Sequence, residues 1–343
     1  MIDISGISQI SRSPLFINEA EGNVRCELCF NNCVIQSGAF GACGVRGNKA
    51  GKGIIPFYGF ISSLALDPIE KKPLYHFKPG SQILSVGFAG CNLRCPFCQN
   101  WHISQNTDIP GKWMECGEIV SAALRQDSSS IAYTYSEPLV HAEYLLDCMA
   151  LARRHGIANA LVTNSSINAD AAKEILQNTS AANIDLKCFS GETYSKNLGG
   201  NLETVLDFIR LGHKMGVHIE ITTLVVPSLN DSDDELNAAA DFIAALDSAI
   251  PWHLSAYHPD YRWNAPPTDA GFLLRTAKNA RKKLRHVYTG NISEGENDTA
   301  CYSCGAVLVR RHGYRVDVCG LAAGGKTYKC AACGETTVII SSD

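Results

Sequence analysis

Short apolar segments alternate with longer segments of helical apolar spacing through most of this chain, and this alternation restricts the fold most. The pattern predicts about six strand–helix repeats from Ile83 to His253, and a closing strand near Val287. Such units build right-handed crossovers in a parallel α/β sheet. The count is too small for an eight-fold barrel, so the pattern leaves a partial barrel and a doubly wound sheet open. Strands are expected at 81–88, 129–135, 157–164, 181–187, 217–227, 251–259 and 286–290, and helices at 114–126, 139–156, 168–178, 200–216, 230–248 and 268–285.

Local signals indicate where some of these helices begin and end. Asn168 and Thr268 are expected N-caps, because a short polar side chain can accept a hydrogen bond from a free N–H of the first turn. Gly156 is the expected C-terminal stop of the helix in 139–156, because glycine tolerates the left-handed conformation found there.

The chain has fifteen cysteines, and eleven of them fall into three groups. Its opening residues lack the pattern of a signal peptide, and no apolar stretch approaches the length of a membrane helix. We therefore expect a cytoplasmic protein, in which clustered cysteines are metal ligands rather than disulfides. The other four, Cys116, Cys148, Cys188 and Cys319, are given no role.

The central group is Cys91, Cys95 and Cys98, on a loop that directly follows the first expected strand. Three thiolates can hold three irons of a [4Fe–4S] cluster, whose usual complement is four cysteines. The fourth iron is then open to a substrate or cofactor, which indicates a catalytic role rather than electron transfer alone. A structural zinc knuckle, or free thiols in a cytosolic protein, is the alternative.

The outer groups suggest further metal sites. Two Cys-x2-Cys pairs, 25 residues apart, flank a segment that alternates like a hairpin with its turn near His312 and Gly313, and this is typical of a zinc ribbon. Near the N-terminus a second set fits either zinc, which we favour, or an auxiliary [4Fe–4S] cluster. The ribbon ligands are Cys301, Cys304, Cys330 and Cys333, and the N-terminal set is Cys26, Cys29, Cys33 and Cys43.

Several segments carry the resemblance to a known family. Together with the cysteine triplet they resemble the radical S-adenosylmethionine (SAM) superfamily, and within it the radical SAM member of the AmmeMemoRadiSam system, akin to the pyruvate formate-lyase activating enzymes. The match runs from about residue 24 to the C-terminus. The segments are DPIEKKPLYHFKPG (67–80), YTYSEP (133–138), VTNS (162–165), DLK (185–187) and LVVPSLND (224–231).

The resemblance implies a partial (β/α)6 barrel, which we expect at 79–296. The cysteine groups then place a Cys-rich metal-binding extension at 1–78 and the zinc ribbon at 297–343. The resemblance also implies that the triplet binds a cluster whose open iron is chelated by the amino and carboxylate groups of SAM. Asp185 and Lys187, which alternation places on one side of their strand, would hold the methionine end. Glu137 would accept from the SAM ammonium, although a capping role is its structural alternative. The implied SAM residues are Phe97, Gln99, Ser136, Glu137, Thr163, Asn164, Asp185, Lys187 and His258.

The expected function is reductive cleavage of SAM to a 5′-deoxyadenosyl radical that abstracts hydrogen from an unidentified substrate. The implied partners are Memo-like and AMMECR-like proteins and an electron donor such as a flavodoxin or ferredoxin. Activation of a glycyl-radical enzyme is an alternative. A non-catalytic iron–sulfur and zinc protein that binds nucleic acid is another, with Arg310, Arg311, Arg315, Lys326 and Lys329 of the ribbon as its cations. The net charge of −4 gives that last alternative no bulk electrostatic support.

Overall fold

An eight-stranded sheet forms the centre of the computed structural model, which describes residues 15–293, 295 and 297–341. Seven of its strands are parallel, in the order β15-β14-β13-β12-β11-β10-β8, and β7 pairs antiparallel with β8 at one edge. The strands are β7 (Ser63–Pro68), β8 (Gln82–Gly87), β10 (Ser130–Thr134), β11 (Ala158–Thr163), β12 (Ala181–Asp185), β13 (His218–Val225), β14 (Trp252–Ala256) and β15 (Val287–Gly290).

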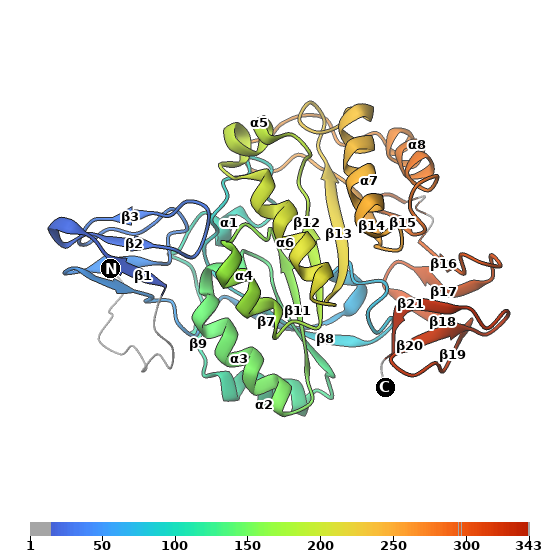
Figure 1. Ribbon diagram of the computed structural model, residues 1–343, viewed down its shortest axis with the longest axis horizontal. Coiled ribbons are helices and arrows are strands. Elements are labelled where there is room, and N and C mark those ends of the chain that lie inside the picture. The colour runs from blue at the N-terminus through green and yellow to red at the C-terminus, as the bar shows by residue number, and fades with distance from the viewer. Residues whose placement is uncertain (1–14, 294, 296, 342–343) are drawn as a thin grey trace.

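One helix of at least eight residues lies between each pair of consecutive parallel strands, and in Figure 1 these long helices cover the outside of the curved sheet. The six predicted repeats and the closing strand are therefore confirmed, and the partial barrel replaces the doubly wound alternative. The helices are α2 (Cys116–Arg125), α3 (Ala142–Arg154), α4 (Ala169–Leu176), α6 (Leu202–Lys214), α7 (Asp233–Asp247) and α8 (Ala270–Ala280). Short helices are α1 (Trp101–Ser104), α5 (Gly191–Thr193), 3₁₀ turns at Ala20–Gly22, Ile69–Lys71 and Pro138–His141, and a π-turn at Tyr194–Leu198.

The two predicted N-caps differ from the observed ones in detail. Asn168 occupies the cap position of α4, but its side chain makes no capping hydrogen bond and instead donates to Glu27 O. Thr268 is not the cap of α8. Asp269 takes that position and accepts from Phe272 N, while the Thr268 hydroxyl donates to Val225 O. Gly156 does follow α3 with a φ of +72°, as predicted.

Small β-sheets lie at the two ends of the barrel, blue and red in Figure 1. The N-terminal strands are β1 (Phe16–Asn18), β2 (Val24–Cys26), β3 (Val34–Ile35), β4 (Gly47–Lys49), β5 (Lys52–Ile54) and β6 (Phe60–Ile61), which pairs with β9 (Lys112–Trp113). The C-terminal strands are β16 (Thr299–Ala300), β17 (Val307–His312), β18 (Arg315–Val318), β19 (Leu321–Ala322), β20 (Thr327–Cys330) and β21 (Thr336–Ile340). The pairing of His312 with Arg315 confirms the predicted ribbon hairpin.

Both end modules dock on the barrel through polar contacts. At the N-terminal end, Arg46 and Glu143 form a buried ion pair with an Nη1–Oε2 distance of 2.6 Å. At the C-terminal end, Ile340 N donates to His76 O at 2.7 Å, and Arg311 Nη2 donates to Tyr75 O at 2.7 Å. The predicted limits at 78/79 and 296/297 stay a proposal, and residues 1–14, 294, 296, 342 and 343 within those ranges lie outside the described part. Among the described residues, no helix is long and apolar enough to cross a membrane.

Candidate active site

The triplet loop begins where β8 ends, at the carboxyl edge of the parallel sheet. β8 is almost wholly buried and delivers Gly90, whose φ of +78° and close approach to the Cys43 carbonyl both require glycine. A Cβ atom at Gly90 would lie 2.5 Å from that carbonyl oxygen. The chain then turns through Cys91, Cys95 and Cys98, which all line one cavity. Ligand-bearing loops are expected at this edge of a parallel sheet.

Polar donors surround the sulfurs of the triplet. Leu93 N–H and Asn164 Nδ2 approach Cys91 Sγ at 3.4 and 3.5 Å, and the Ser104 hydroxyl lies 3.2 Å from Cys98 Sγ. Burial raises the pKa of the Cys91 thiol well above its usual range and that of Cys95 to about 12. Bound iron would offset this cost, since a coordinating thiol loses its proton. These residues fit an iron–sulfur cluster.

Glu137 joins the ends of β10 and β11. Its carboxylate accepts hydrogen bonds from Thr163 Oγ1 at 2.6 Å, Asn164 N at 2.7 Å and Leu139 N at 3.0 Å. Burial raises the pKa of Glu137 to about 7, against the lowering effect of these donors. The capping alternative therefore describes the observed contacts of Glu137, and its contact with SAM stays a prediction.

The turn before Glu137 is held in an unusual backbone conformation. Tyr135 has a φ of +71°, in the left-handed region that favours glycine. Its hydroxyl donates to Asp67 on β7, and Lys72 Nζ lies 4.2 Å from the centre of its ring. Strained residues of this kind are held in place by surrounding contacts, often at functional sites. Ser136 then faces the cavity.

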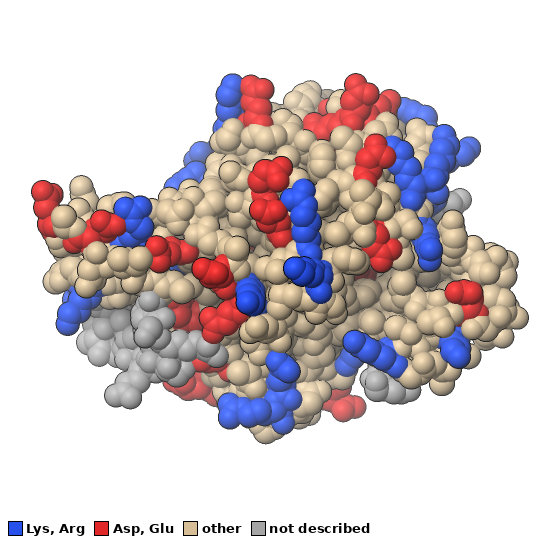
Figure 2. Space-filling view, in the orientation of Figure 1, with Lys and Arg blue, Asp and Glu red and all other residues tan. Residues whose placement is uncertain are grey.

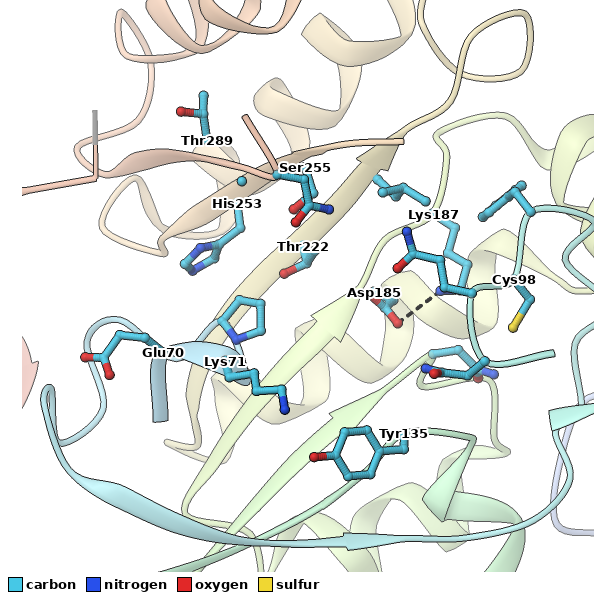
Figure 3. Close-up of a pocket in the computed structure, with 18 of the residues that line it drawn as sticks. Glu70, Lys71, Cys98, Tyr135, Asp185, Lys187, Thr222, His253, Ser255 and Thr289 are labelled. Atoms are coloured by element: carbon cyan, nitrogen blue, oxygen red, sulfur yellow. Dashed lines mark hydrogen bonds and ion pairs between the residues drawn. The ribbon is translucent and has the colours of Figure 1, made fainter. Parts of the chain in front are cut away.

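Asp185 and Lys187 form an ion pair at the end of β12, as their alternation predicted. The Nζ–Oδ2 distance is 3.0 Å, and both residues line the cavity (Figure 3). Burial disfavours the ammonium, but the Asp185 carboxylate outweighs it and raises the pKa of Lys187. The cavity therefore keeps a fixed cation close to the triplet.

One cavity of about 930 Å³ connects the triplet with a second polar region. Figure 3 shows Cys98 and Lys187 on one side, and Glu70, His253 and Thr289 on the other. The cavity also reaches the ribbon hairpin, and its size is near the upper end of the range of ligand pockets. Lining residues that the sequence did not identify as site residues include Glu70, Lys71, Tyr75, Thr222, His253, Ser255, Thr289, Arg311 and Tyr314.

Several buried polar atoms on the cavity lining have no hydrogen-bond partner among the described residues. They are Ser136 Oγ, Thr222 Oγ1, Thr289 Oγ1, Glu70 Oε2 and Arg311 Nε. Buried polar groups are normally satisfied, so unpartnered ones gathered around one cavity indicate a bound ligand.

Arg311 is not the exposed ribbon cation that the sequence suggested. It is 5% exposed, packs on the Tyr75 ring and donates to Thr299 Oγ1 at 2.7 Å. Its charge is therefore unavailable to an outside nucleic acid. Figure 2 shows positive and negative side chains interspersed over the face in view, without one extended basic surface. The segment 67–80 could have pointed to this region, but no local pattern connects it with Arg311.

The predicted SAM residues differ in their placement. Phe97, Gln99, Ser136, Glu137, Asn164, Asp185 and Lys187 line the cavity. Thr163 is buried behind it and bonds to Glu137. His258 is exposed and is not a lining residue. Contact with SAM stays a prediction for all nine.

The ribbon cysteines have the spacing of a zinc site. Cys301 and Cys333 Sγ are 3.8 Å apart, and Cys304 and Cys330 Sγ are 3.7 Å apart. A tetrahedron with zinc–sulfur bonds of about 2.3 Å has edges of about 3.8 Å. All four sulfurs lie within 4.8 Å of one another, which fits the predicted zinc ribbon.

Comparison with known proteins identifies the family. The sequence pattern of the radical SAM superfamily matches residues 85–243. The chain is 38% identical over 337 residues to an uncharacterised protein of Methanocaldococcus jannaschii, covering 96% of this chain and 99% of that protein. It is 26% identical over 182 residues to a pyruvate formate-lyase-activating enzyme of Clostridium pasteurianum, covering 50% of this chain and 74% of that enzyme.

A solved structure has the same fold. The crystal structure of a radical SAM methyltransferase from Sphaerobacter thermophilus matches with a TM-score of 0.50 and 14% identity, over 67% of this chain and 71% of that one. The AmmeMemoRadiSam subgroup stays a prediction, but the wider assignment is shown: the chain belongs to the radical SAM superfamily and is homologous to the pyruvate formate-lyase activating enzymes.

Proposed function

We propose that this enzyme cleaves SAM reductively and abstracts a hydrogen atom from a small polar molecule. That molecule would bind in the far half of the cavity, where Glu70, His253 and Thr289 lie opposite the triplet. The observation that carries the proposal is the continuous cavity from the triplet to three atoms without a hydrogen-bond partner, Glu70 Oε2, Thr289 Oγ1 and Arg311 Nε. A polar molecule in that half would supply the missing hydrogen bonds.

Cys91, Cys95 and Cys98 would hold the [4Fe–4S] cluster and leave one iron open to SAM. When bound and reduced, the cluster supplies the electron that splits SAM into methionine and a 5′-deoxyadenosyl radical. Lys187 would pair with the SAM carboxylate, since its ammonium points into the cavity beside the triplet.

Other residues would shape the cavity. Glu137 and Asn164 would keep the strand ends in place, because the carboxylate of Glu137 is already occupied by three donors. The protein must also exclude water and other hydrogen donors from the radical. Tyr75 and the ribbon residue Tyr314 line the far half and would contribute to that exclusion.

The cellular compartment, the electron donor and the partner proteins of the enzyme are inferred from its sequence. Fifteen cysteines used mainly as metal ligands favour the reducing cytoplasm, where a flavodoxin or ferredoxin would donate the electron. Memo-like and AMMECR-like partners follow from the resemblance carried by segment 67–80. That segment supplies Glu70, Lys71 and Tyr75 to the cavity, which supports a subgroup-specific substrate.

Activation of a glycyl-radical enzyme is the second candidate, favoured by the similarity to the Clostridium pasteurianum enzyme. It would require a polypeptide loop to enter the cavity. The ribbon hairpin and segment 67–80 line the far half, so a small molecule is the better-supported substrate.

Anaerobic reconstitution, reduction with dithionite and assay of 5′-deoxyadenosine test the proposal. Wild-type protein and the Cys319→Ser control should form 5′-deoxyadenosine, and Cys91→Ala should form none. Absence of product from wild-type protein with an intact, reduced cluster would refute the proposed function. Metabolite profiling of a Cys95→Ala strain against a wild-type strain would then narrow the substrate.

A further inference from the structure

The four N-terminal cysteines are brought together beside the barrel. Cys26 ends β2, and its N–H donates to Cys33 O at 2.9 Å across the β2–β3 hairpin. Cys29 lies in the turn between them, within electrostatic range of both sulfurs, and Cys43 is in turn within electrostatic range of Cys29. The fold thus gathers three thiols of the β2–β3 hairpin and a fourth from a later turn into one group.

Nitrogen donors are directed at the sulfurs of this group. Arg46 Nε donates to Cys26 Sγ at 3.2 Å, and Ala42 N donates to Cys33 Sγ at 3.4 Å. Asn31 Nδ2 approaches Cys29 Sγ at 3.8 Å, and backbone N–H groups of Val45 and Arg46 face Cys43. Donors of this kind stabilise metal-bound thiolates and tune iron–sulfur clusters. Simple packing of small apolar side chains would not require them.

A buried positive charge accompanies the group. Arg46 is 1% exposed, so its guanidinium is withdrawn from water next to Cys26. Glu143 neutralises it through two hydrogen bonds of 2.6 and 2.8 Å. The remaining Nε donor points at sulfur, which is the arrangement expected beside an anionic metal–thiolate centre.

The spacing of the sulfurs separates zinc from a cluster. Within the described ranges, the ribbon cysteines are the one set of three or more metal-binding side chains whose ligand atoms all lie within 4.8 Å. Among any three of the N-terminal sulfurs, at least one pair is therefore more than 4.8 Å apart, wider than the edge of about 3.8 Å of a zinc tetrahedron, and the same holds for the triplet. In a [4Fe–4S] cluster each cysteine binds a different iron, which spreads the sulfurs in this way. This revises the preference for zinc drawn from the sequence.

The group also abuts the triplet loop. The Asn92 side chain, next to Cys91, hydrogen-bonds to Cys29, and Asn31 Nδ2 donates to Asn92 O at 3.4 Å. Arg94 Nη2 donates to Ala42 O at 3.3 Å. Asn92 thus lies between the two cysteine groups.

We propose that Cys26, Cys29, Cys33 and Cys43 hold a second, fully ligated [4Fe–4S] cluster beside the one at the triplet. Four thiolates leave no iron open, so SAM binds at the triplet alone. The inference does not depend on the reaction, because it concerns metal content.

The test is iron, sulfide and zinc analysis of the full-length chain after anaerobic reconstitution. Wild-type protein and Cys319→Ser should hold about eight irons, about eight sulfides and about one zinc per chain. About four irons with about two zincs in the wild type would overturn the proposal.

A variant without the triplet cysteines shows whether the N-terminal cysteines hold a cluster by themselves. Cys91→Ala/Cys95→Ala/Cys98→Ala should keep about four irons and, after reduction, the electron paramagnetic resonance signal of a [4Fe–4S] cluster. Loss of all iron from this variant would overturn the proposal. Cys29→Ala/Cys33→Ala should lose about half of the wild-type iron, and unchanged iron in it would also overturn the proposal. Neither readout requires SAM cleavage, so failure of the proposed function would be seen separately.

Discussion

The ammonium of Lys187 lies 3.0 Å from the carboxylate of Asp185, two residues earlier, at the carboxyl end of β12. The Lys187 side chain is one-fifth exposed, and that exposed part faces the cavity. The pair therefore presents a cation to a ligand while it remains neutral overall.

The first prediction concerns SAM affinity. Replacing Lys187 by Met removes the cation, and a lost charge-assisted hydrogen bond costs about 1.5–3 kcal/mol, or roughly 10–150-fold in Kd. Equilibrium binding of SAM to the reconstituted variant measures this. Lys196→Met is the control, because Lys196 pairs with Glu192 on the surface and should leave the Kd unchanged. Equal affinity in Lys187→Met and wild type would remove Lys187 from the SAM site.

The second prediction concerns the ribbon. Cys304→Ser should remove the ribbon zinc and lower the thermal stability of the ribbon, since a core this small depends on its metal. Cys319 is the matched control, as it is an exposed cysteine of the same ribbon outside the four-sulfur group. Zinc analysis should show about one zinc fewer in Cys304→Ser alone. Retention of the full zinc content would contradict the assignment.

The third prediction is a pH effect on stability. His141 is buried, and its Nε2 lies 2.8 Å from Ala89 O. Burial lowers its pKa from 6.5 to about 4, despite the raising effect of that carbonyl. Between pH 6.5 and about 4, the His141 imidazole is therefore protonated in the unfolded chain and neutral in the folded chain. The contribution is fully present above pH 6.5 and is lost as pH falls toward 4, by at most about 1.4 kcal/mol per pH unit.

Thermal melts of wild type and His141→Gln at pH 7.5, 6 and 5 check this prediction. The wild type should lose stability more steeply between pH 6 and 5 than the variant, which has no imidazole to protonate. The two slopes must differ for the assignment to hold. His155→Gln, which changes a more exposed histidine at the end of α3, should follow the wild-type slope.

Local sequence signals were sufficient for the barrel, because each strand and each helix carries its own periodicity. The antiparallel edge strand β7 was not predicted. It is partly exposed, with Leu64 and Leu66 37% and 39% exposed, and it is held by pairing with β8 rather than by burial. The Thr268 prediction failed because two neighbouring residues could both cap, and the Thr268 hydroxyl instead bonds to Val225 O of β13 and to Tyr257 N just after β14.

The half of the site beside the cysteine triplet could be predicted from motifs at strand ends, but the far half could not be predicted. Tyr75 and Arg311 are 236 residues apart and meet only because the ribbon docks on the barrel. The packing of Arg311 against that ring depends on tertiary structure, which a local pattern does not contain. The same limit applies to the metal at the four N-terminal cysteines. Their spacing along the chain is compatible with zinc or a cluster, and the distances between their sulfurs depend on tertiary structure.

The last prediction concerns Arg46 and Glu143, whose side chains are 2% and 3% exposed. Arg46→Met leaves Glu143 as an uncompensated buried charge, which should destabilise the protein by about 3–5 kcal/mol. Arg46→Met/Glu143→Leu removes both charges and should recover part of that loss. Chemical denaturation of both variants gives the two free energies of unfolding.

The exposed pair of Arg210 and Asp207 is the control, and Arg210→Met should cost no more than about 1 kcal/mol. If the double variant is no more stable than Arg46→Met, the cost does not come from the stranded Glu143 carboxylate. It then comes from the other contacts of Arg46, with Cys26 Sγ and the Phe16 ring, and a parallel fall in iron content would identify the contact with Cys26 as the source.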